Sequence, residues 1–379
     1  MSSTSVTIDA DVPGGNIIVD EIRETDILLH QDLRDTTTDW FYWCFRVRDA
    51  GGQTLRFQFT ESRAIGVRGP AVSFDEGETW EWTCDGDADE NVFEFTFPDD
   101  AQCVRFSFGM PYQLSRWETF SAEMASNAHF EEWKLCETRK GRRVPYVRVG
   151  CVEDEPRLRM FVTARHHCCE MMAGYSMEGL LGWIASDESD EAQWMRDNVE
   201  VLAVPFADLD GVEDGDQGKN RDPRDHGRDY EGESLYPTCE AIREMIPAWS
   251  GGKLRFVLDM HCPWISGNHN EVIYVVGTPD KTISEQQRVF SDVLETTASA
   301  LPFKAEDYLP YGVDWNVPSN MSNGRSPTRW AGELDGVRMS GTIEVAYANA
   351  LGAEVTQETA LLFGHDIGKA AYSYLVDMQ

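Results

Sequence analysis

The spacing of apolar residues changes near residue 140, and this change implies two folds in one chain. Before it, segments such as 40–49 and 54–62 alternate aromatic with polar residues and are separated by Gly- and Asp-rich turns. Alternation with a period of two is typical of strands that bury one face. We therefore predict an antiparallel β-sandwich domain over residues 1–137 and a second domain over residues 138–379.

The second part of the chain alternates nearly continuous apolar runs with patterns of helical spacing. Runs rich in Val, Ile, Leu and Phe are typical of strands buried on both faces, so helices should cover both sides of an α/β sheet. The predicted strands are 144–150, 157–164, 199–205, 254–260, 271–277 and 341–347. The predicted helices are 170–184, 188–198, 234–248, 283–300 and 356–376, the last capped by Thr356.

The chain is strongly acidic, with 66 Asp and Glu against 33 Lys and Arg and a net charge of −33. Nucleic-acid binding depends on Lys and Arg that neutralise phosphates, so we expect no nucleic-acid partner. An acidic surface stays hydrated and self-repelling in concentrated salt. Two interpretations stay open, a salt-tolerant source and an ordinary acidic soluble enzyme.

Signals for membranes and secretion are not visible in the sequence. The sequence has no run of about 18 apolar residues, the length that a helix needs to cross a bilayer. Its start lacks the basic and apolar regions of a secretory signal. The nine cysteines contain no CxxC pair, which favours reduced thiols over a disulfide framework. We therefore expect a cytoplasmic location and no membrane partner, whereas the sequence indicates no oligomeric state.

The stretch His167-Cys168-Cys169-Glu170 follows an apolar, β-prone run and precedes a helical pattern. A His and a carboxylate three residues apart at such a junction can point at one metal ion. His261 ends another apolar run, at the sheet edge where α/β folds place ligands. His167, Glu170 and His261 together predict a site for one zinc ion with an open position for water.

Two further kinds of residue are expected at a hydrolytic zinc site. Glu344 lies inside an otherwise apolar strand, where an unpaired charge would be costly, and it is the candidate general base. The turn-rich loop 205–230 carries Arg221, Arg224 and Arg228, whose guanidinium groups can bind a carboxylate. Water on zinc, a buried base and an anion clamp together predict a hydrolase.

These elements resemble those of the zinc metallocarboxypeptidases, the funnelin or carboxypeptidase A-like family, and are most similar to its cytosolic carboxypeptidase-like branch. TARHHCCE (163–170) resembles that branch's Ala-Arg-x-His-Pro-Gly-Glu element, with two cysteines in place of Pro-Gly. DLDGVEDGDQGKNR (208–221) resembles the family's Pro-Asp-Gly-Val…Gly-x-x-Arg stretch, and RDHGRDY (224–230) its Asp-Leu-Asn-Arg-x-Trp element. DMH (259–261) and GTIE (341–344) resemble its strand-end His and its Thr-x-Glu.

The resemblance implies a fold and a set of roles. The fold would be a β-sandwich followed by a carboxypeptidase-like α/β/α domain with a mixed, largely parallel central sheet. The zinc ligands would be His167, Glu170 and His261. Glu344 would be the general base, Arg221 would polarise the scissile carbonyl and stabilise the oxyanion, and Arg228 would hold the terminal carboxylate of the substrate.

Two positions depart from the family's pattern. Gly227 stands where the family has Asn, so half of the usual carboxylate clamp is missing. The segment 319–340 has no tyrosine to match the family's substrate-capping Tyr. Trp330 and Arg329 are the candidates to line the pocket instead.

Three functions follow from these patterns. The first is a zinc metallocarboxypeptidase that removes a C-terminal or side-chain-linked amino acid from a peptide. The second is a zinc amidohydrolase or deacylase acting on acyl-amino acids or γ-glutamyl bonds, which the altered clamp favours. The third is a catalytically degenerate protein that binds peptides or glycans, and the complete set of zinc and base residues argues against it.

Overall fold

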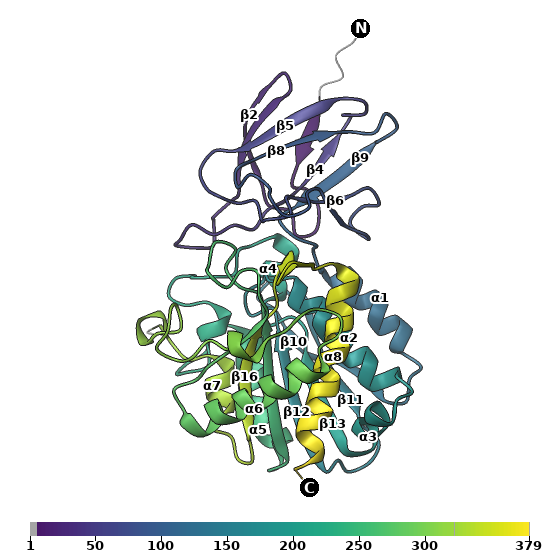
Figure 1. Cartoon of the computed structure of the whole chain (residues 1–379), viewed down its shortest axis with the longest axis vertical. Helices are drawn as coiled ribbons and strands as arrows, with labels where there is room; N and C mark the ends of the chain where they lie inside the picture. The colour runs from purple at the N-terminus through teal and green to yellow at the C-terminus, as the bar shows by residue number, and fades with distance from the viewer. Residues whose placement is uncertain (1–5, 322, 379) are drawn as a thin grey trace.

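The protein has two lobes stacked along its long axis (Figure 1). The computed structural model describes residues 6–321 and 323–378. The first lobe, drawn in purple and blue, contains strands and loops, and we call it the sandwich lobe. The second, called the α/β lobe, contains a seven-stranded sheet and the α-helices of the described residues.

Two sheets form the sandwich lobe, with strand orders β1-β4-β9-β6-β7 and β2-β3-β5-β8. Their pairings are antiparallel as predicted, apart from β3 and β5, which run parallel. The strands are β1 (Thr7–Asp9), β2 (Ile18–Arg23), β3 (Asp26–His30), β4 (Cys44–Arg48), β5 (Thr54–Phe59), β6 (Ala71–Ser73), β7 (Glu81–Trp82), β8 (Val92–Thr96) and β9 (Cys103–Ser107).

Aromatic residues fill the space between these two sheets. The ring of Phe57 on β5 lies 5.6 Å from that of Phe45 on β4 and 5.6 Å from that of Phe106 on β9, measured between centroids. All three side chains are buried. The period-two pattern therefore places one face of each sheet in a shared aromatic core, which confirms the predicted sandwich.

The seven-stranded sheet has the order β10-β11-β13-β12-β14-β16-β15. The pairings among β13, β12, β14 and β16 are parallel, and the outer pairings are antiparallel. The sheet is mixed as predicted, with its parallel part confined to the centre. The strands are β10 (Phe130–Glu137), β11 (Arg143–Gly150), β12 (Leu158–Ala164), β13 (Val199–Val204), β14 (Leu254–His261), β15 (Tyr274–Val276) and β16 (Met339–Glu344).

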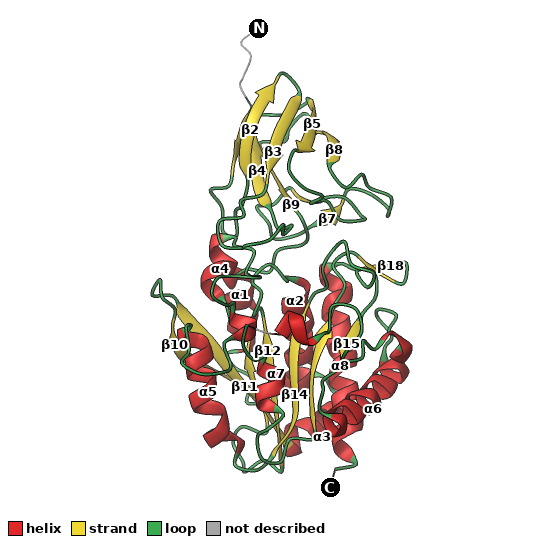
Figure 2. Cartoon of the chain, turned by 90° about the vertical axis from the view of Figure 1, so that its left-hand side faces the viewer, coloured by secondary structure: helices red, strands yellow, loops and turns green. Residues whose placement is uncertain are grey.

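Helices cover both faces of this sheet. Figure 2 shows α5 to the left of the sheet and α6 and α8 to its right. α2 and α3 contact α8, and α7 contacts β14 and β16. The predicted helices are confirmed with small shifts at their ends, and Thr356 caps α8 as expected. The helices are α1 (Leu114–Met124), α2 (Met172–Ser186), α3 (Asp190–Asn198), α4 (Leu209–Asp214), α5 (Pro237–Ser250), α6 (Lys281–Thr297), α7 (Pro327–Ala331) and α8 (Gln357–Val376), with short pairings of β17 (Asn349–Ala350) and β18 (Ala353–Glu354).

Sheet membership changes between β9 and β10, before the predicted domain boundary. β10 pairs with β11 in the seven-stranded sheet, so the boundary predicted at residue 137 falls in the hairpin that joins these two strands. β10 is a partly exposed edge strand, and its residues FEEWKLCE do not alternate regularly between polar and apolar. No strand is predicted for this segment from periodicity.

The helices α2 and α8 touch through their backbones. A Cβ atom on Gly179 would lie 1.9 Å from the carbonyl oxygen of Leu361, and one on Gly364 would lie 2.1 Å from that of Ser176. Any side chain at either glycine would push the helices apart. This close contact joins α2, which follows the candidate metal-binding loop, to the last described helix.

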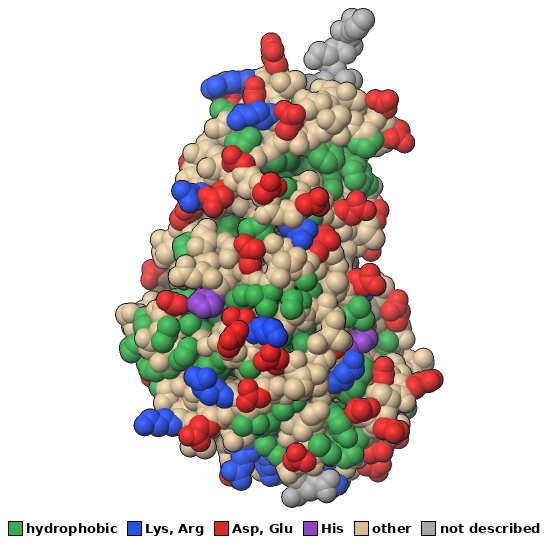
Figure 3. Space-filling view, viewed as in Figure 1, with side chains coloured by type: hydrophobic (Ala, Val, Ile, Leu, Met, Phe, Trp, Pro, Cys, Tyr) green, Lys and Arg blue, Asp and Glu red, His purple; other side chains and the backbone are tan. Residues whose placement is uncertain are grey.

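Acidic side chains are spread over both lobes of the face shown in Figure 3, with fewer Lys and Arg between them. This distribution agrees with the net charge of −33. None of the helices in the described part of the chain is both long and apolar enough to span a bilayer.

Candidate active site

Buried contacts fix the loop between β12 and α2. Arg165 adopts a left-handed φ of 60° and donates from Nε to the carbonyl oxygen of Cys168 (2.9 Å) and from Nη1 to that of Tyr112 (2.6 Å). Burial raises the pKa of the Cys169 thiol to about 12 and that of Cys168 well above its usual range. The two cysteines therefore pack the loop as buried thiols, and neither belongs to the groups of described residues that could hold a metal ion.

The three candidate zinc ligands converge at the carboxyl ends of neighbouring parallel strands. His167 Nδ1 lies 2.7 Å from Glu170 Oε1, and His261 Nδ1 lies 2.7 Å from Glu170 Oε2. The two Nδ1 atoms are 3.1 Å apart, and all three side chains are buried. The adjacency of β12 and β14 brings the loop after the first strand next to His261 at the end of the second.

This set of donor atoms fits a zinc ion. Two ring nitrogens turned toward each other at 3.1 Å present like dipoles unless a proton or a metal ion lies between them. Burial opposes the charge of Glu170, but the adjacent His167 and His261 hold the pKa of its carboxyl well below the usual range. Two imidazole nitrogens and one ionised carboxylate are the ligands of a catalytic zinc site.

Carboxylates lie against the far nitrogens of both imidazoles. Asp259 Oδ2 lies 2.6 Å from Nε2 of His261, and its Oδ1 lies 2.8 Å from Nδ1 of His166. Asp225 Oδ1 lies 3.8 Å from Nε2 of His167. The short contact with Asp259 fixes the ring orientation of His261 and leaves its Nδ1 free for a metal ion. The sequence signal for Asp259 was its place two residues before His261, on the same face of β14.

Glu344 ends β16 directly beside His261 in the register of the sheet. Its carboxylate is buried, and Oε2 has no hydrogen-bond partner among the described residues. Burial raises the pKa of this carboxyl to about 7; the charge of Glu170 acts in the same direction, and His261 and Lys219 act against it. A carboxyl with an unpaired oxygen that titrates near neutral pH can take a proton from water.

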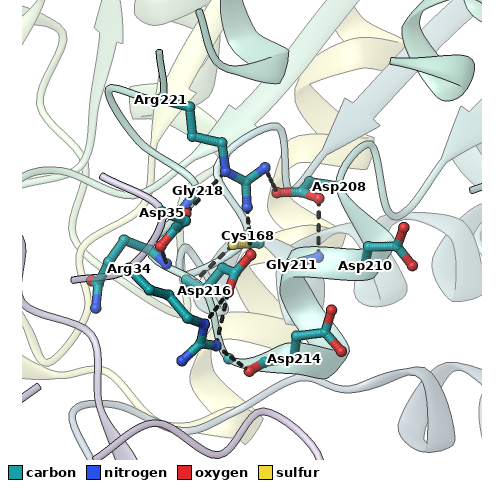
Figure 4. A network of polar contacts seen from close by, with 12 residues as sticks. Arg34, Asp35, Cys168, Asp208, Asp210, Gly211, Asp214, Asp216, Gly218 and Arg221 are labelled. Carbon is teal, nitrogen blue, oxygen red and sulfur yellow. Dashed lines mark hydrogen bonds and ion pairs between the residues drawn. The ribbon is translucent and has the colours of Figure 1, made fainter. Parts of the chain in front are cut away.

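The structure does not bring Arg221 to this cluster. Its guanidinium donates to Asp35 (2.9 Å), Asp208 (2.6 Å) and Asp216 (2.9 Å), as Figure 4 shows. It lines a different hollow from the one around His261. The predicted oxyanion role does not suit this placement, because three carboxylates already neutralise the cation and hold it away from the metal ligands.

Lys219, which the sequence prediction did not include, reaches the cluster instead. Its Nζ lies 3.2 Å from Nε2 of His167, and its side chain lines the hollow that also contains Glu344. Asp35 of the sandwich lobe accepts a hydrogen bond from the backbone N–H of Gly218 (2.8 Å) and so fixes the chain just before Lys219. Nothing in the local sequence distinguishes this lysine from the three arginines that follow it.

The structure leaves no room for a side chain at Gly227. A Cβ atom at this position would lie 2.9 Å from Nε2 of His167, so an Asn would displace the imidazole. Arg228, the predicted carboxylate ligand, lines the same hollow as the cluster, and its Nη1 donates to the carbonyl oxygen of Gly227 (3.0 Å). The predicted carboxylate-binding part of the site therefore contains Arg228 but no Asn side chain at position 227.

The two candidate pocket residues on α7, Arg329 and Trp330, have different surroundings in the structure. Arg329 lines the hollow with Arg228. Trp330 packs against Tyr230, with 5.4 Å between ring centroids, and is not among the residues that line this hollow. Of these two candidates, Arg329 is the one placed to meet a ligand.

Solved structures share this architecture along its whole length, although no family model matches the chain. The metallo-carboxypeptidase from Burkholderia cenocepacia superposes with a TM-score of 0.81 at 18% identity, over 99% of this chain and 100% of that chain. The metallo-carboxypeptidase from Pseudomonas aeruginosa in complex with (2-guanidinoethylmercapto)succinic acid gives 0.76 at 20% identity, over 98% and 99%. The chain has the metallo-carboxypeptidase fold. The predicted fold class and resemblance are confirmed.

Two curated proteins match in sequence. Uncharacterized protein ZMO1242 of Zymomonas mobilis is 24% identical over 266 residues, which are 68% of this chain and 67% of that protein. Cytosolic carboxypeptidase 3 of Mus musculus is 26% identical over 215 residues, 52% of this chain and 21% of that protein. The second match supports the cytosolic carboxypeptidase-like branch of the metallo-carboxypeptidase fold and covers a minor part of that relative's length.

Proposed function

We propose that this protein is a zinc-dependent metallocarboxypeptidase that removes a C-terminal or side-chain-linked amino acid from a peptide. The observation that carries the proposal is the convergence of His167, Glu170 and His261 beside the unpaired carboxylate of Glu344. The metallo-carboxypeptidase fold supports it independently.

The residues of the site divide the hydrolysis between them. Bound by the two histidines and Glu170, a zinc ion would supply a Lewis acid that lowers the pKa of water. Glu344 would take a proton from the attacking water and return it to the leaving nitrogen. Lys219 Nζ, rather than Arg221, would donate to the carbonyl oxygen as negative charge develops on it.

The carboxylate of the leaving amino acid would bind on the side of Arg228. Arg228 and Arg329 both line the hollow beside the cluster, and guanidinium groups bind carboxylates through two parallel hydrogen bonds. The Pseudomonas aeruginosa neighbour was solved with a succinic acid derivative, which is a dicarboxylate. A peptide with a free C-terminal or side-chain carboxylate is therefore the substrate class that we assign.

The proposal is tested with paired peptides whose C-terminus is either free or amidated. The zinc-loaded protein should release an amino acid from the free peptide and not from the amidated one. Glu344→Gln should lower kcat by roughly 10²- to 10⁴-fold while the protein still binds one zinc per chain. A zinc-loaded protein that releases nothing from either peptide, or a protein that binds no zinc, contradicts the proposal.

A second candidate, a zinc amidohydrolase acting on acyl-amino acids or γ-glutamyl bonds, is favoured by Gly227. Gly227 has no side-chain amide to join Arg228 in binding a terminal carboxylate. Hydrolysis of acyl-amino acids with little turnover of peptides would identify this activity. A cytoplasmic location remains part of the proposal, supported by nine cysteines that are all free thiols and by the match to Cytosolic carboxypeptidase 3.

A further inference from the structure

Two hollows meet at the candidate active site and differ in their side chains. The smaller, of about 60 Å³, contains Arg228 and Arg329. The larger, of about 350 Å³, extends toward the sandwich lobe and contains no arginine among its lining residues. Lys219, Trp315 and Glu344 line both, so the candidate oxyanion donor and base stand where the two hollows join.

This arrangement indicates which hollow would bind each side of the scissile bond. The carboxylate of the leaving amino acid is assigned to the arginines of the smaller hollow, and the scissile bond to the junction at Lys219 and Glu344. The larger hollow is then left for the part of the substrate on the amino-terminal side of the bond, the acyl side.

The walls of the larger hollow are aromatic. Trp40, Trp264, Tyr274 and Trp315 line it. Trp264 and Trp315 keep 49% and 37% of their surface exposed, although most large apolar side chains of this protein are buried. Exposed tryptophans that line a hollow beside a catalytic centre offer flat surfaces on which a planar group can stack.

We propose that this hollow is a subsite that selects an aromatic or large apolar residue on the acyl side of the scissile bond. The inference rests on the proposed carboxypeptidase function, since it uses the direction set by Arg228. An acidic residue is disfavoured beside Asp314, the carboxylate of this hollow to which neither a zinc-binding nor a catalytic role is assigned.

Trp40 makes the sandwich lobe a part of this subsite. Its Nε1 donates to Sγ of Cys169 in the metal-binding loop (3.3 Å), and Lys219 Nζ lies 6.0 Å from the centre of its ring. The ring also stacks on Phe41, with 5.0 Å between centroids. These contacts hold a side chain of one lobe in a fixed position over the active site of the other.

The test uses blocked dipeptides that share the C-terminal residue removed fastest and differ in the preceding residue, which is Phe, Leu, Ala, Asp or Lys. We expect kcat/KM for the Phe substrate to exceed that for the Ala substrate about tenfold, the size of one aromatic stacking contact, and Asp to be the poorest. Trp264→Ala should remove most of this preference, so that kcat/KM for the Phe substrate falls toward that for the Ala substrate. Trp133→Ala is the matched control, since Trp133 is 51% exposed on β10 and does not line the hollow.

The outcomes separate this inference from the proposed function. Equal kcat/KM values across the series, a preference for Lys, or a Trp264→Ala protein that behaves as Trp133→Ala would overturn the aromatic subsite while the carboxypeptidase proposal stands. Failure to hydrolyse any member of the series with zinc bound would overturn both. Trp40→Phe keeps an aromatic ring without Nε1 and should retain part of the preference for Phe, whereas Trp40→Ala should lose it.

Discussion

The carboxylate of Asp35, in the sandwich lobe, accepts a hydrogen bond of 2.9 Å from Nε of Arg221, in the α/β lobe. The same carboxylate accepts from the backbone N–H groups of Gln217 (2.9 Å) and Gly218 (2.8 Å). Lys219 follows directly, and its Nζ lies 3.2 Å from Nε2 of His167, one of the proposed zinc ligands. The sandwich lobe therefore holds both the arginine that points away from the candidate active site and the backbone just before the lysine that reaches it.

Arg221 should matter for stability. Arg221→Met leaves Asp35, Asp208 and Asp216 facing one another with little access to water, and we expect it to lower the free energy of unfolding by about 3–5 kcal/mol. Urea unfolding measures this change. Arg63→Met, which removes an exposed partner of Glu90, is the control and should cost less than about 0.5 kcal/mol. Full stability combined with lost turnover would return the oxyanion role to Arg221.

Lys219 should matter for catalysis. Lys219→Met removes the proposed oxyanion donor and should lower kcat by roughly 10²- to 10³-fold. Zinc content and unfolding midpoint should stay close to those of the wild type, since the side chain is not a zinc ligand in the proposed site. Lys304→Met, an exposed lysine paired with Glu295, serves as the control. A variant with normal kcat would show that another group stabilises the oxyanion.

The activity should depend on the ionisation of Glu344. The general base must be ionised to accept a proton, and burial raises the pKa of this carboxyl to about 7. The charge of a bound zinc ion favours the ionised carboxyl, so we expect kcat/KM of the zinc-loaded enzyme to rise with pH to an inflection below the metal-free value of about 7. A profile that stays flat between pH 5 and 8 would argue against Glu344 as the base.

The Glu344 carboxyl should lower the free energy of unfolding of the metal-free protein at high pH. The folded state holds its proton up to a pKa of about 7, whereas the unfolded chain releases it near 4.5, so stability falls as the pH rises between these values. Glu344→Gln has no proton to lose. At pH 8 with a chelator present, it should exceed the wild type by up to about 3 kcal/mol in free energy of unfolding. At pH 4.5 the two should differ little.

Asp259 should control zinc affinity through His261. Asp259→Asn replaces the carboxylate that lies 2.6 Å from Nε2 of His261, and we expect zinc affinity to weaken about 10- to 100-fold. Competition with a fluorescent chelator measures this without any substrate. Asp314→Asn, in the neighbouring aromatic hollow, is the control. Unchanged affinity would show that Asp259 does not orient the ligand.

The sequence predicted the features of this fold that depend on local pattern. The apolar runs of β12 and β14 and the positions of His167 and His261 at their ends follow from strand periodicity and the α/β rule. Lys219 could not be selected, because its direction depends on Asp35, a residue nearly two hundred positions earlier on another lobe. Long-range hydrogen bonds leave no local signal.

The same limit explains the other differences. β10 has no regular alternation and is not predicted as a strand, and its pairing with β11 is apparent only in the folded structure. The role of Trp40 in the site likewise depends on a contact with Cys169 far along the chain. The absence of space at Gly227 depends on the position of the His167 ring, so the departure from Asn could be noticed in the sequence but not explained from it.

The glycine contact between α2 and α8 has a consequence for the order of events during protein synthesis. A nascent chain that has left the ribosome as far as β16 already contains every proposed zinc ligand and Glu344. The helix that continues from the metal-binding loop would still lack its backbone-to-backbone partner, which is translated later. We therefore expect the proposed zinc site to form only after α8 has emerged and packed against α2.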